Sequence, residues 1–83
     1  MVFDYSKLLG RIREKGFIQA QLAEIAGMTP GTLSQKLNNQ AHFKQKEMLM
    51  ICDVLDISMY EIGDYFFTLE VRKNTNDEVT SNA

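Results

Sequence analysis

The sequence has few of the residues that build metal centres, covalent bridges or membrane spans. Among 83 residues there is one cysteine, Cys52, one histidine, His42, one proline and no tryptophan. A lone cysteine cannot form a disulfide within the chain, and this pair is too small for a zinc cluster. No apolar run approaches the roughly 20 residues that span a bilayer, and the first residues do not resemble a secretory signal. We therefore expect a cytoplasmic protein with no metal, no cofactor and no membrane partner.

The length leaves room for one small domain, because a second core becomes common only above about 150 residues. Hydrophobic residues at 45% and charged residues at 24% are ordinary for a folded domain. We expect one folded unit over residues 1–73. Residues 74–83 lack the apolar side chains that would offset the entropy of ordering, so a disordered tail is expected there. The sequence shows no catalytic cluster, and neither an enzyme nor a small-molecule substrate is expected.

Charge is distributed unevenly along the chain. The net charge is −2, but residues 1–46 carry +4 and residues 47–83 carry −6. A phosphate backbone responds to the field within a Debye length of about 8 to 10 Å, so a basic half can dock while an acidic half faces away. The alternative is that these charges reflect only an uneven solvated surface and that the chain has no such partner.

Apolar residues recur at three- and four-residue steps in five short segments, which predicts an all-α domain. Asp4 or Ser6 is expected to cap the first helix, and Gly16 to end it in a left-handed turn. Ser58 and Glu61 form a capping-box pattern that opens the last helix. The expected helices cover residues 5–15, 19–26, 30–38 and 46–55, and a last one that runs from the capping box through residue 65. Beyond it, Phe67, Leu69 and Val71 alternate with polar residues, which predicts a short C-terminal β arm.

The segment over residues 19–39 has the pattern of a helix-turn-helix. Thr29 is a good N-cap, and Pro30 falls at the first helical position, where its missing N–H is no loss. Leu33 and Leu37 lie one turn apart and are expected to face inward, which leaves mostly small or polar residues outward. Two helices joined by a tight turn with glycine form the arrangement that inserts its second helix into the major groove.

On these residues the chain resembles the lambda-repressor-like helix-turn-helix family, and more narrowly the short Cro and repressor proteins of temperate phages. The matching pieces are Gln19 with Leu22 and Ala23, Gly27 at the turn, and residues 32–38 as recognition helix. The resemblance implies a compact five-helix DNA-binding domain over about residues 4–66.

Three departures from the family pattern shift the expected contacts. Ile18 and Lys44 stand where relatives often place a helix cap. Pro30 and Gly31 stand early in the recognition helix, where relatives often carry polar side chains that contact bases. Neither of these two side chains can bond a base edge, so base contacts should move along the helix.

The expected contacts follow from side-chain chemistry. Gln35 can bond adenine through two hydrogen bonds, Lys36 can reach guanine or a phosphate, and Thr32 offers a methyl group and a hydroxyl. The residues expected at base edges are Thr29, Thr32, Gln35 and Lys36. Those expected along the DNA backbone are Gln19, Gly31, Ser34, Asn38, Asn39, Gln40 and Lys44. Arg11, Arg13, Lys15 and Lys46 are expected to add attraction that is independent of sequence. The alternative to a DNA contact is that Gln19 is only an exposed residue in the first turn of its helix. For Asn39 the alternative is that it only forms a left-handed turn.

The resemblance also implies a homodimer on two half-sites of a double-stranded DNA operator. The expected dimer interface is the last helix and the arm, with Tyr65, Phe66, Phe67, Leu69 and Val71. The alternative is that Phe66 or Phe67 covers the protein's own core.

The function expected from the sequence is therefore a sequence-specific DNA-binding regulator, a phage repressor or Cro-like protein that occupies an operator through residues 30–38. The alternative is a helical protein-interaction module, such as an antirepressor, an adaptor or an antitoxin-like regulator. His42 is expected to be a loop residue and Cys52 a buried, unreactive thiol.

Overall fold

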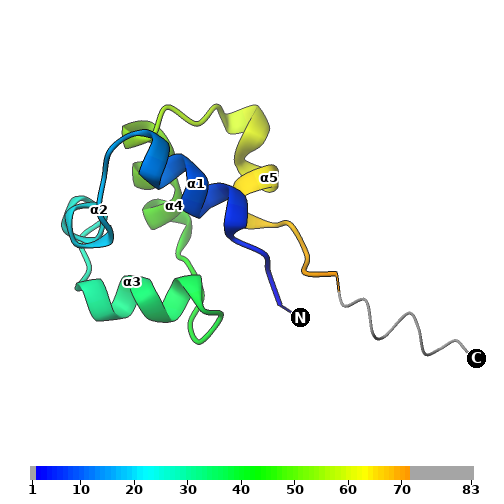
Figure 1. The fold of residues 1–83 in the computed structure, drawn as a ribbon, viewed down its shortest axis with the longest axis horizontal. Helices are drawn as coiled ribbons and strands as arrows, with labels where there is room; N and C mark the ends of the chain where they lie inside the picture. Colours follow the sequence, from blue (N-terminus) through cyan, green and yellow to red (C-terminus); the bar gives the residue numbers. More distant parts are fainter. Residues whose placement is uncertain (1, 72–83) are drawn as a thin grey trace, which may run out of the picture.

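The computed structural model describes residues 2–71, and over this range the chain is all-α (Figure 1). Helices α1 and α4 cross in the centre of the molecule, with α2 and α3 on one side and α5 on the other (Figure 1). The prediction of five helices in a small all-α domain is confirmed. The predicted tail, residues 74–83, lies outside the described residues. The elements are α1 Ser6–Glu14, α2 Gln19–Ile25, α3 Pro30–Leu37, α4 Gln45–Val54, a 3-10 turn η1 Met59–Glu61, and α5 Ile62–Phe66.

Side chains from all five helices meet in one core. The seven largest fully buried side chains come from α1, α2, α3, α4, α5 and the residue after α4. Full burial of each large aliphatic or aromatic side chain contributes about 1.5 to 3 kcal/mol, so this shared core holds the short helices together. These side chains are Phe66, Leu8, Leu22, Leu33, Ile51, Leu55 and Cys52.

The helix starts explain why the element bounds fall where they do. Thr29 Oγ1 accepts a hydrogen bond from the Thr32 amide at 3.1 Å, with Pro30 at the first position of α3, as predicted. Ile18 and Lys44 offer no side-chain cap. Instead, Gln21 and Glu47 reach back and accept from their amide groups at 3.0 and 2.9 Å. Each is one half of a capping box, formed without a Ser or Thr at the N-cap.

The predicted end of α1 agrees with the structure, whereas the predicted starts of the first and last helices differ from it in part. Gly16 has φ +81°, the left-handed conformation expected after α1. Asp4 precedes the N-cap of α1 and accepts hydrogen bonds from the Ser6 amide and hydroxyl at 2.8 and 2.6 Å. Ser58 caps a 3-10 turn by accepting from the Tyr60 amide at 3.1 Å, so α5 begins only at Ile62. Short 3-10 turns at helix starts are common.

The C-terminal arm forms one antiparallel bridge, between Phe3 and Leu69, where the sequence predicts a short β arm. The Asp4 amide donates to the Thr68 carbonyl at 2.7 Å beside this bridge. On the other side of the N-terminal segment, the Asn39 side chain bonds both the amide and the carbonyl of Phe3, at 2.9 and 3.0 Å. Residues 2–4 are therefore held between the arm and the turn after α3. Within residues 2–71, no helix has the length and apolar character that crossing a membrane requires.

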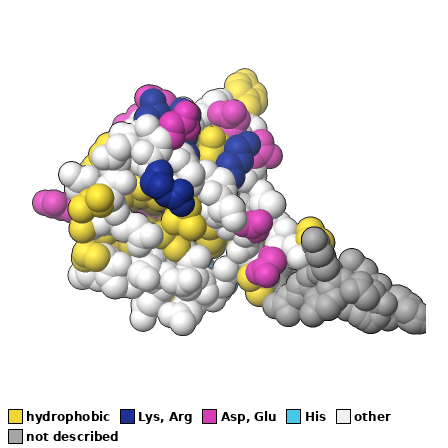
Figure 2. Space-filling view, viewed as in Figure 1, with side chains coloured by type: hydrophobic (Ala, Val, Ile, Leu, Met, Phe, Trp, Pro, Cys, Tyr) yellow, Lys and Arg dark blue, Asp and Glu magenta, His cyan; other side chains and the backbone are white. Residues whose placement is uncertain are grey.

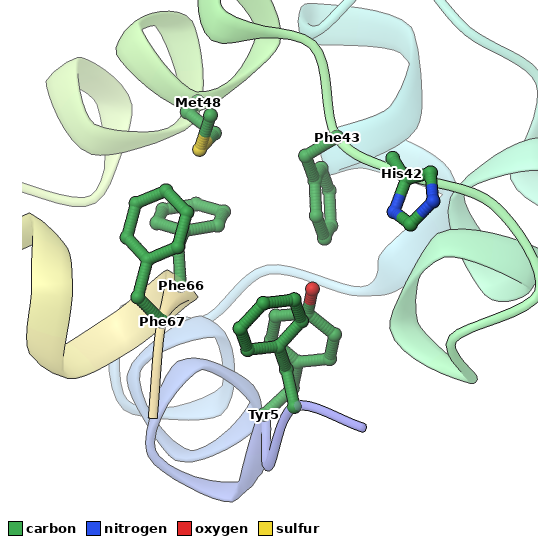
Figure 3. Close-up of a pocket in the computed structure, with 7 residues that line it drawn as sticks. Tyr5, His42, Phe43, Met48, Phe66 and Phe67 are labelled. Atoms are coloured by element: carbon green, nitrogen blue, oxygen red, sulfur yellow. The ribbon is translucent and has the colours of Figure 1, made fainter. Parts of the chain in front are cut away.

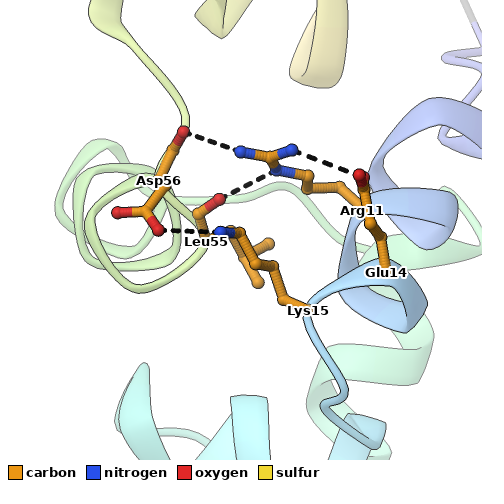
Figure 4. Close-up of polar contacts among 5 residues, drawn as sticks. All are labelled: Arg11, Glu14, Lys15, Leu55 and Asp56. Atoms are coloured by element: carbon orange, nitrogen blue, oxygen red, sulfur yellow. Dashed lines mark hydrogen bonds and ion pairs between the residues drawn. The ribbon is translucent and has the colours of Figure 1, made fainter.

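Arg11 links α1 to the C-terminal end of α4 (Figure 4). Its Nε donates to the Leu55 carbonyl and its Nη2 to the Asp56 carbonyl, both at 2.9 Å. These two carbonyls directly follow the last residue of α4, so the guanidinium satisfies them and also opposes the negative end of the helix dipole. Lys15 Nζ lies 2.9 Å from the Asp56 carboxylate. Two cations expected to attract DNA are thus engaged within the fold.

Candidate interaction surface on helices α2 and α3

Helices α2 and α3 pack on each other through small and aliphatic residues. Ala23, Ala26 and Leu33 are buried between the two helices and the core. The Met28 amide donates to the Ala23 carbonyl at 2.9 Å, and Gly27 in the turn has φ +78°. A positive φ costs an ordinary residue about 1 to 2 kcal/mol, so glycine permits the tight turn. The turn directs α3 along one edge of the molecule, where its outer face meets solvent (Figure 1).

The outer face of α3 is polar and small. Thr29, Pro30, Gly31 and Gln35 are exposed, whereas Thr32 is half-buried. The Thr29 hydroxyl donates to Thr32 Oγ1 at 2.9 Å, so these two hydroxyls bond each other. Gln35 therefore presents the largest exposed functional group on this face, its amide.

Lys36 does not lie on the outer face, and its expected contact with a base edge is wrong. Its side chain is only about 6% exposed, and its Nζ donates to Glu47 of α4, whose side chain is 13% exposed. Position 36 comes one turn after the buried Leu33, so the helix directs it inward, toward α4. The aliphatic stem of Lys36 packs there, and the ammonium ends at the carboxylate.

Glu47 is a structural residue that the sequence analysis missed. Its carboxylate joins the first turn of α4 to α3 by accepting from both the Lys44 amide and the Lys36 ammonium. Burial raises the pKa of Glu47. Hydrogen bonds from the Lys36 ammonium and the Lys44 amide lower it, and so does the attraction of both lysine charges. These effects outweigh burial, so the pKa lies below its usual value. The signal in the sequence was its place three residues after the N-cap.

The residues expected at the DNA backbone are exposed, except that Ser34 is half-buried. Asn38 Nδ2 donates to the Ser34 carbonyl at 2.8 Å. Asn39 has φ +63°, and its side chain is engaged with Phe3, so it is a left-handed turn residue that holds the N-terminal segment. Within the described range, the side chains of Gln19, Gln40 and Lys44 form no hydrogen bond or ion pair with the protein.

The α2–α3 segment carries little charge at its surface. Residues 19–40 contain two charged residues, Glu24 and Lys36. Because Lys36 is buried and paired, the exposed charge of this segment is that of Glu24, which is −1. In the orientation of Figure 1, Figure 2 shows neither basic nor acidic colour over α3 along the lower edge. Across residues 2–71, the exposed cations without a carboxylate partner are Arg13, Lys44 and Lys46.

The expected dimer residues divide into two groups. Tyr65 and Phe66 are buried in the protein's own core, where α5 packs on α1, so their assignment to a dimer interface is wrong. Phe67, Leu69 and Val71 are exposed. Leu69 already pairs with Phe3, which uses part of the edge that an intermolecular strand pair requires. A homodimer through the three exposed residues stays a prediction.

The two residues with other reactive groups occupy the predicted places. Cys52 is buried on α4, and burial raises the pKa of its thiol above the usual value. His42 lies exposed in the loop after α3. In the described part of the chain, no three His, Cys, Asp or Glu side chains gather as a metal ion would require.

Comparison with known proteins finds a matching family and a similar solved structure. Residues 1–69 match the family described as Protein of unknown function (DUF739). The fold is similar to the solution structure of the modulator of repression (MOR) of the temperate bacteriophage TP901-1 from Lactococcus lactis, with a TM-score of 0.69 and 39% identity. That similarity covers 87% of this chain and 97% of the other. No curated protein matches the chain.

Proposed function

We propose that this chain, which belongs to the family of proteins of unknown function DUF739, is a phage-type regulator that modulates repression by binding another protein of the same regulatory circuit. The contact surface is the exposed face of α3 together with the adjoining part of α2. The similarity to a modulator of repression supports a role in such a circuit. Fold similarity alone does not distinguish a protein partner from an operator, so that choice depends on the surface itself.

The observation that carries the proposal is the missing positive charge on α3. Lys36, the one cation of residues 19–40, is buried against Glu47. Half to two-thirds of the hydrogen bonds in protein–DNA interfaces go to phosphate and sugar, and neutralising phosphates supplies much of the affinity. A surface with a net exposed charge of −1 gains none of that attraction.

The composition of the same surface suits a protein partner. Ile18 and Ile25, at the two ends of α2, are exposed apolar residues, and α2 packs on α3, whose outer face is neutral and polar. Protein interfaces are depleted of charge at their centre and mix apolar with neutral polar side chains there. Gln35, whose exposed side-chain amide forms no hydrogen bond within residues 2–71, is the residue expected to make a directional contact.

The test uses the purified protein, the repressor of the same phage and a DNA fragment that carries the operator. In a gel shift at about 150 mM salt, the protein alone should leave the DNA unshifted, and it should change the shift that the repressor produces. Gln35→Ala should reduce this effect about tenfold, as expected if Gln35 is one of the few residues that carry most of the binding energy. Gln45→Ala removes the same chemical group from an exposed site at the start of α4 and serves as the matched control.

Direct binding to the operator is the second candidate. It is favoured by the exposed Gln19 and Gln35 at the positions where the fold of a DNA-binding helix pair presents polar side chains. Its affinity would rise as salt is lowered with a shallow logarithmic slope, because only Arg13, Lys44 and Lys46 are unpaired, exposed cations of residues 2–71. An operator shift without repressor that Gln35→Ala weakens would establish this candidate and overturn the first.

A further inference from the structure

An open pocket of about 440 Å³ lies on the side of the molecule where the N-terminal segment meets the loop after α3 (Figure 3). Five aromatic rings and one methionine form most of its wall. Ligand sites in proteins are commonly clefts of about 300 to 1,000 Å³ with predominantly apolar walls. The lining residues are Phe3, Tyr5, His42, Phe43, Met48, Phe66 and Phe67.

The walls of the pocket are held by contacts between the rings. Phe43 packs edge to face on Tyr5 and on Phe66, with ring centres 5.5 and 5.2 Å apart. Phe3 packs edge to face on Phe67 at 6.0 Å. Such pairs are favourable beyond the area they bury, so the pocket is formed before any ligand arrives. Phe67 is 51% exposed, which leaves one ring of the wall in solvent.

The Tyr5 hydroxyl is a polar group in this apolar wall. Tyr5 is only 7% exposed, and no residue in the range 2–71 accepts or donates a hydrogen bond at its hydroxyl. Figure 3 shows its oxygen directed into the space that the aromatic rings surround. Buried polar side-chain atoms nearly always have a partner, so an occupant that accepts a hydrogen bond here would satisfy this group.

The segment over residues 42–46 beside the pocket is basic. His42 lines the wall, and Lys44 and Lys46 lie one and three residues after Phe43. Both lysines are exposed, and within the described residues neither forms an ion pair. None of the lining residues is acidic. Charge complementarity therefore favours an occupant with negative charge next to an apolar ring.

We infer that this pocket receives a phenylalanine or tyrosine side chain from a segment of a partner protein that carries acidic residues on both sides of the ring. The ring enters among the aromatic side chains, a neighbouring carbonyl accepts from Tyr5, and the acidic residues face Lys44 and Lys46. Aromatic anchors in well-formed pockets commonly supply most of the binding energy of an interface. The identity of the occupant as a protein rests on the proposed function, whereas the pocket and its charge do not.

The test is an NMR titration of the isotope-labelled protein with three short peptides at about 50 mM salt, where surface charges are weakly screened. The first is acetyl-Glu-Asp-Tyr-Asp-Glu-amide, the second has alanine in place of tyrosine, and the third has lysine in place of every acid. The first peptide should shift the signals of Phe43 and Met48. The lysine peptide should bind at least about tenfold more weakly, and the alanine peptide should cause no shift at these residues.

Variants of the protein separate the ring, the charge and the hydroxyl. Phe67→Ala should weaken the first peptide about tenfold, whereas Tyr60→Ala, which removes an aromatic ring that is 99% exposed on η1, should have no effect. The double variant Lys44→Glu and Lys46→Glu should reverse the preference between the acidic and basic peptides. Acids are favourable in the first turn of a helix, so this variant should fold. Tyr5→Phe should weaken the first peptide several-fold.

Equal binding of the acidic and lysine peptides, or shifts confined to another surface, would overturn the inference. Self-association of the wild-type protein that Tyr60→Ala abolishes would also overturn it, because the occupant would then be a second copy of the chain. Gln35→Ala should leave peptide binding unchanged. Failure of the repressor experiment with intact peptide binding would therefore count against the proposed function and not against the pocket.

Discussion

The buried pair of Lys36 and Glu47 leads to the sharpest prediction about this fold, which concerns Glu47→Ala. The substitution removes the carboxylate that accepts from both the Lys36 ammonium and the Lys44 amide. It leaves the ammonium of a lysine with a side chain about 6% exposed without its partner, and it removes the capping group of α4. Two structural elements are affected at once, because Glu47 joins the start of α4 to the last turn of α3.

The size of the effect follows from burial. Exposed ion pairs contribute only about 0.2 to 1 kcal/mol, but removing one partner of a buried pair costs about 3 to 5 kcal/mol. Both side chains keep a small exposed fraction, so we place Glu47→Ala at the low end, about 3 kcal/mol less stable. For a domain of this size each kcal/mol lowers Tm by about 4 to 8 °C. Lys36→Met keeps the packed stem and should cost less, about 1 to 2 kcal/mol, because Glu47 retains the Lys44 amide.

Acid should weaken the same contact. The pKa of Glu47 is lowered in the folded protein, so the folded state binds a proton at this group less readily than the unfolded state does. The stability that Glu47 contributes is therefore present above its ordinary pKa and is lost as the pH falls through the lowered value. Wild type should lose more stability than Glu47→Gln over that acid range.

The assay is urea unfolding followed by circular dichroism at neutral pH, for wild type, Glu47→Ala, Lys36→Met, Glu47→Leu and the double variant that combines the last two. The double variant should be close to wild type in stability, since apolar replacement of a buried pair is often neutral or stabilising. The reasoning is refuted if Glu47→Ala lies within about 0.5 kcal/mol of wild type and the effects of Lys36→Met and Glu47→Leu simply add in the double variant. Such additivity would mean that the two charges do not interact in solution.

Three further predictions concern other contacts of the described chain. Arg11→Met should destabilise the protein by about 2 kcal/mol in urea unfolding, because it removes charge-assisted hydrogen bonds to the two carbonyls that follow α4; an unchanged midpoint would contradict this contribution. Asn39→Gly retains the left-handed turn but loses both bonds to Phe3, so amide exchange at Phe3 should accelerate at least tenfold with global stability unchanged within about 0.5 kcal/mol. The buried Cys52 thiol, with its raised pKa, should react with a disulfide reagent only after denaturant is added; rapid reaction in the folded protein would contradict its burial.

The helices were predictable where periodicity and cap chemistry agreed. Thr29 and Pro30 fixed the start of α3, and the predicted range of residues 30–38 differs from Pro30–Leu37 by one residue. The first and fourth helices were also predicted within one residue at each end. The last helix was predicted less well, because the Ser58 cap stabilises a 3-10 turn as readily as an α-helical one. Alternation after residue 66 predicted a strand, but its partner segment is only residues 2–4, so one bridge forms.

The site was less predictable, for two physical reasons. Charge suggested that Lys36 faces solvent, whereas its spacing of three from Leu33 places it on the buried side of α3. A lysine can occupy such a position when a carboxylate from another helix meets it, and no local pattern shows which carboxylate that is. The aromatic pocket could not be predicted because its rings come from three distant parts of the chain, around residues 3–5, 43 and 66–67. Only the packing of α1, α4 and α5 brings them together.

One residue connects the stability of this fold to its proposed role. In a helix pair that binds DNA, a cation on the outer face adds affinity for phosphate and little to the fold. Here Lys36 is directed inward, where it joins α3 to α4 through Glu47. The contact that stabilises α3 thereby removes the only positive charge of residues 19–40 from the surface. The inward direction follows from the helical position of Lys36 relative to Leu33. The neutral character of this face is therefore a consequence of the fold, and it supports the proposed protein partner.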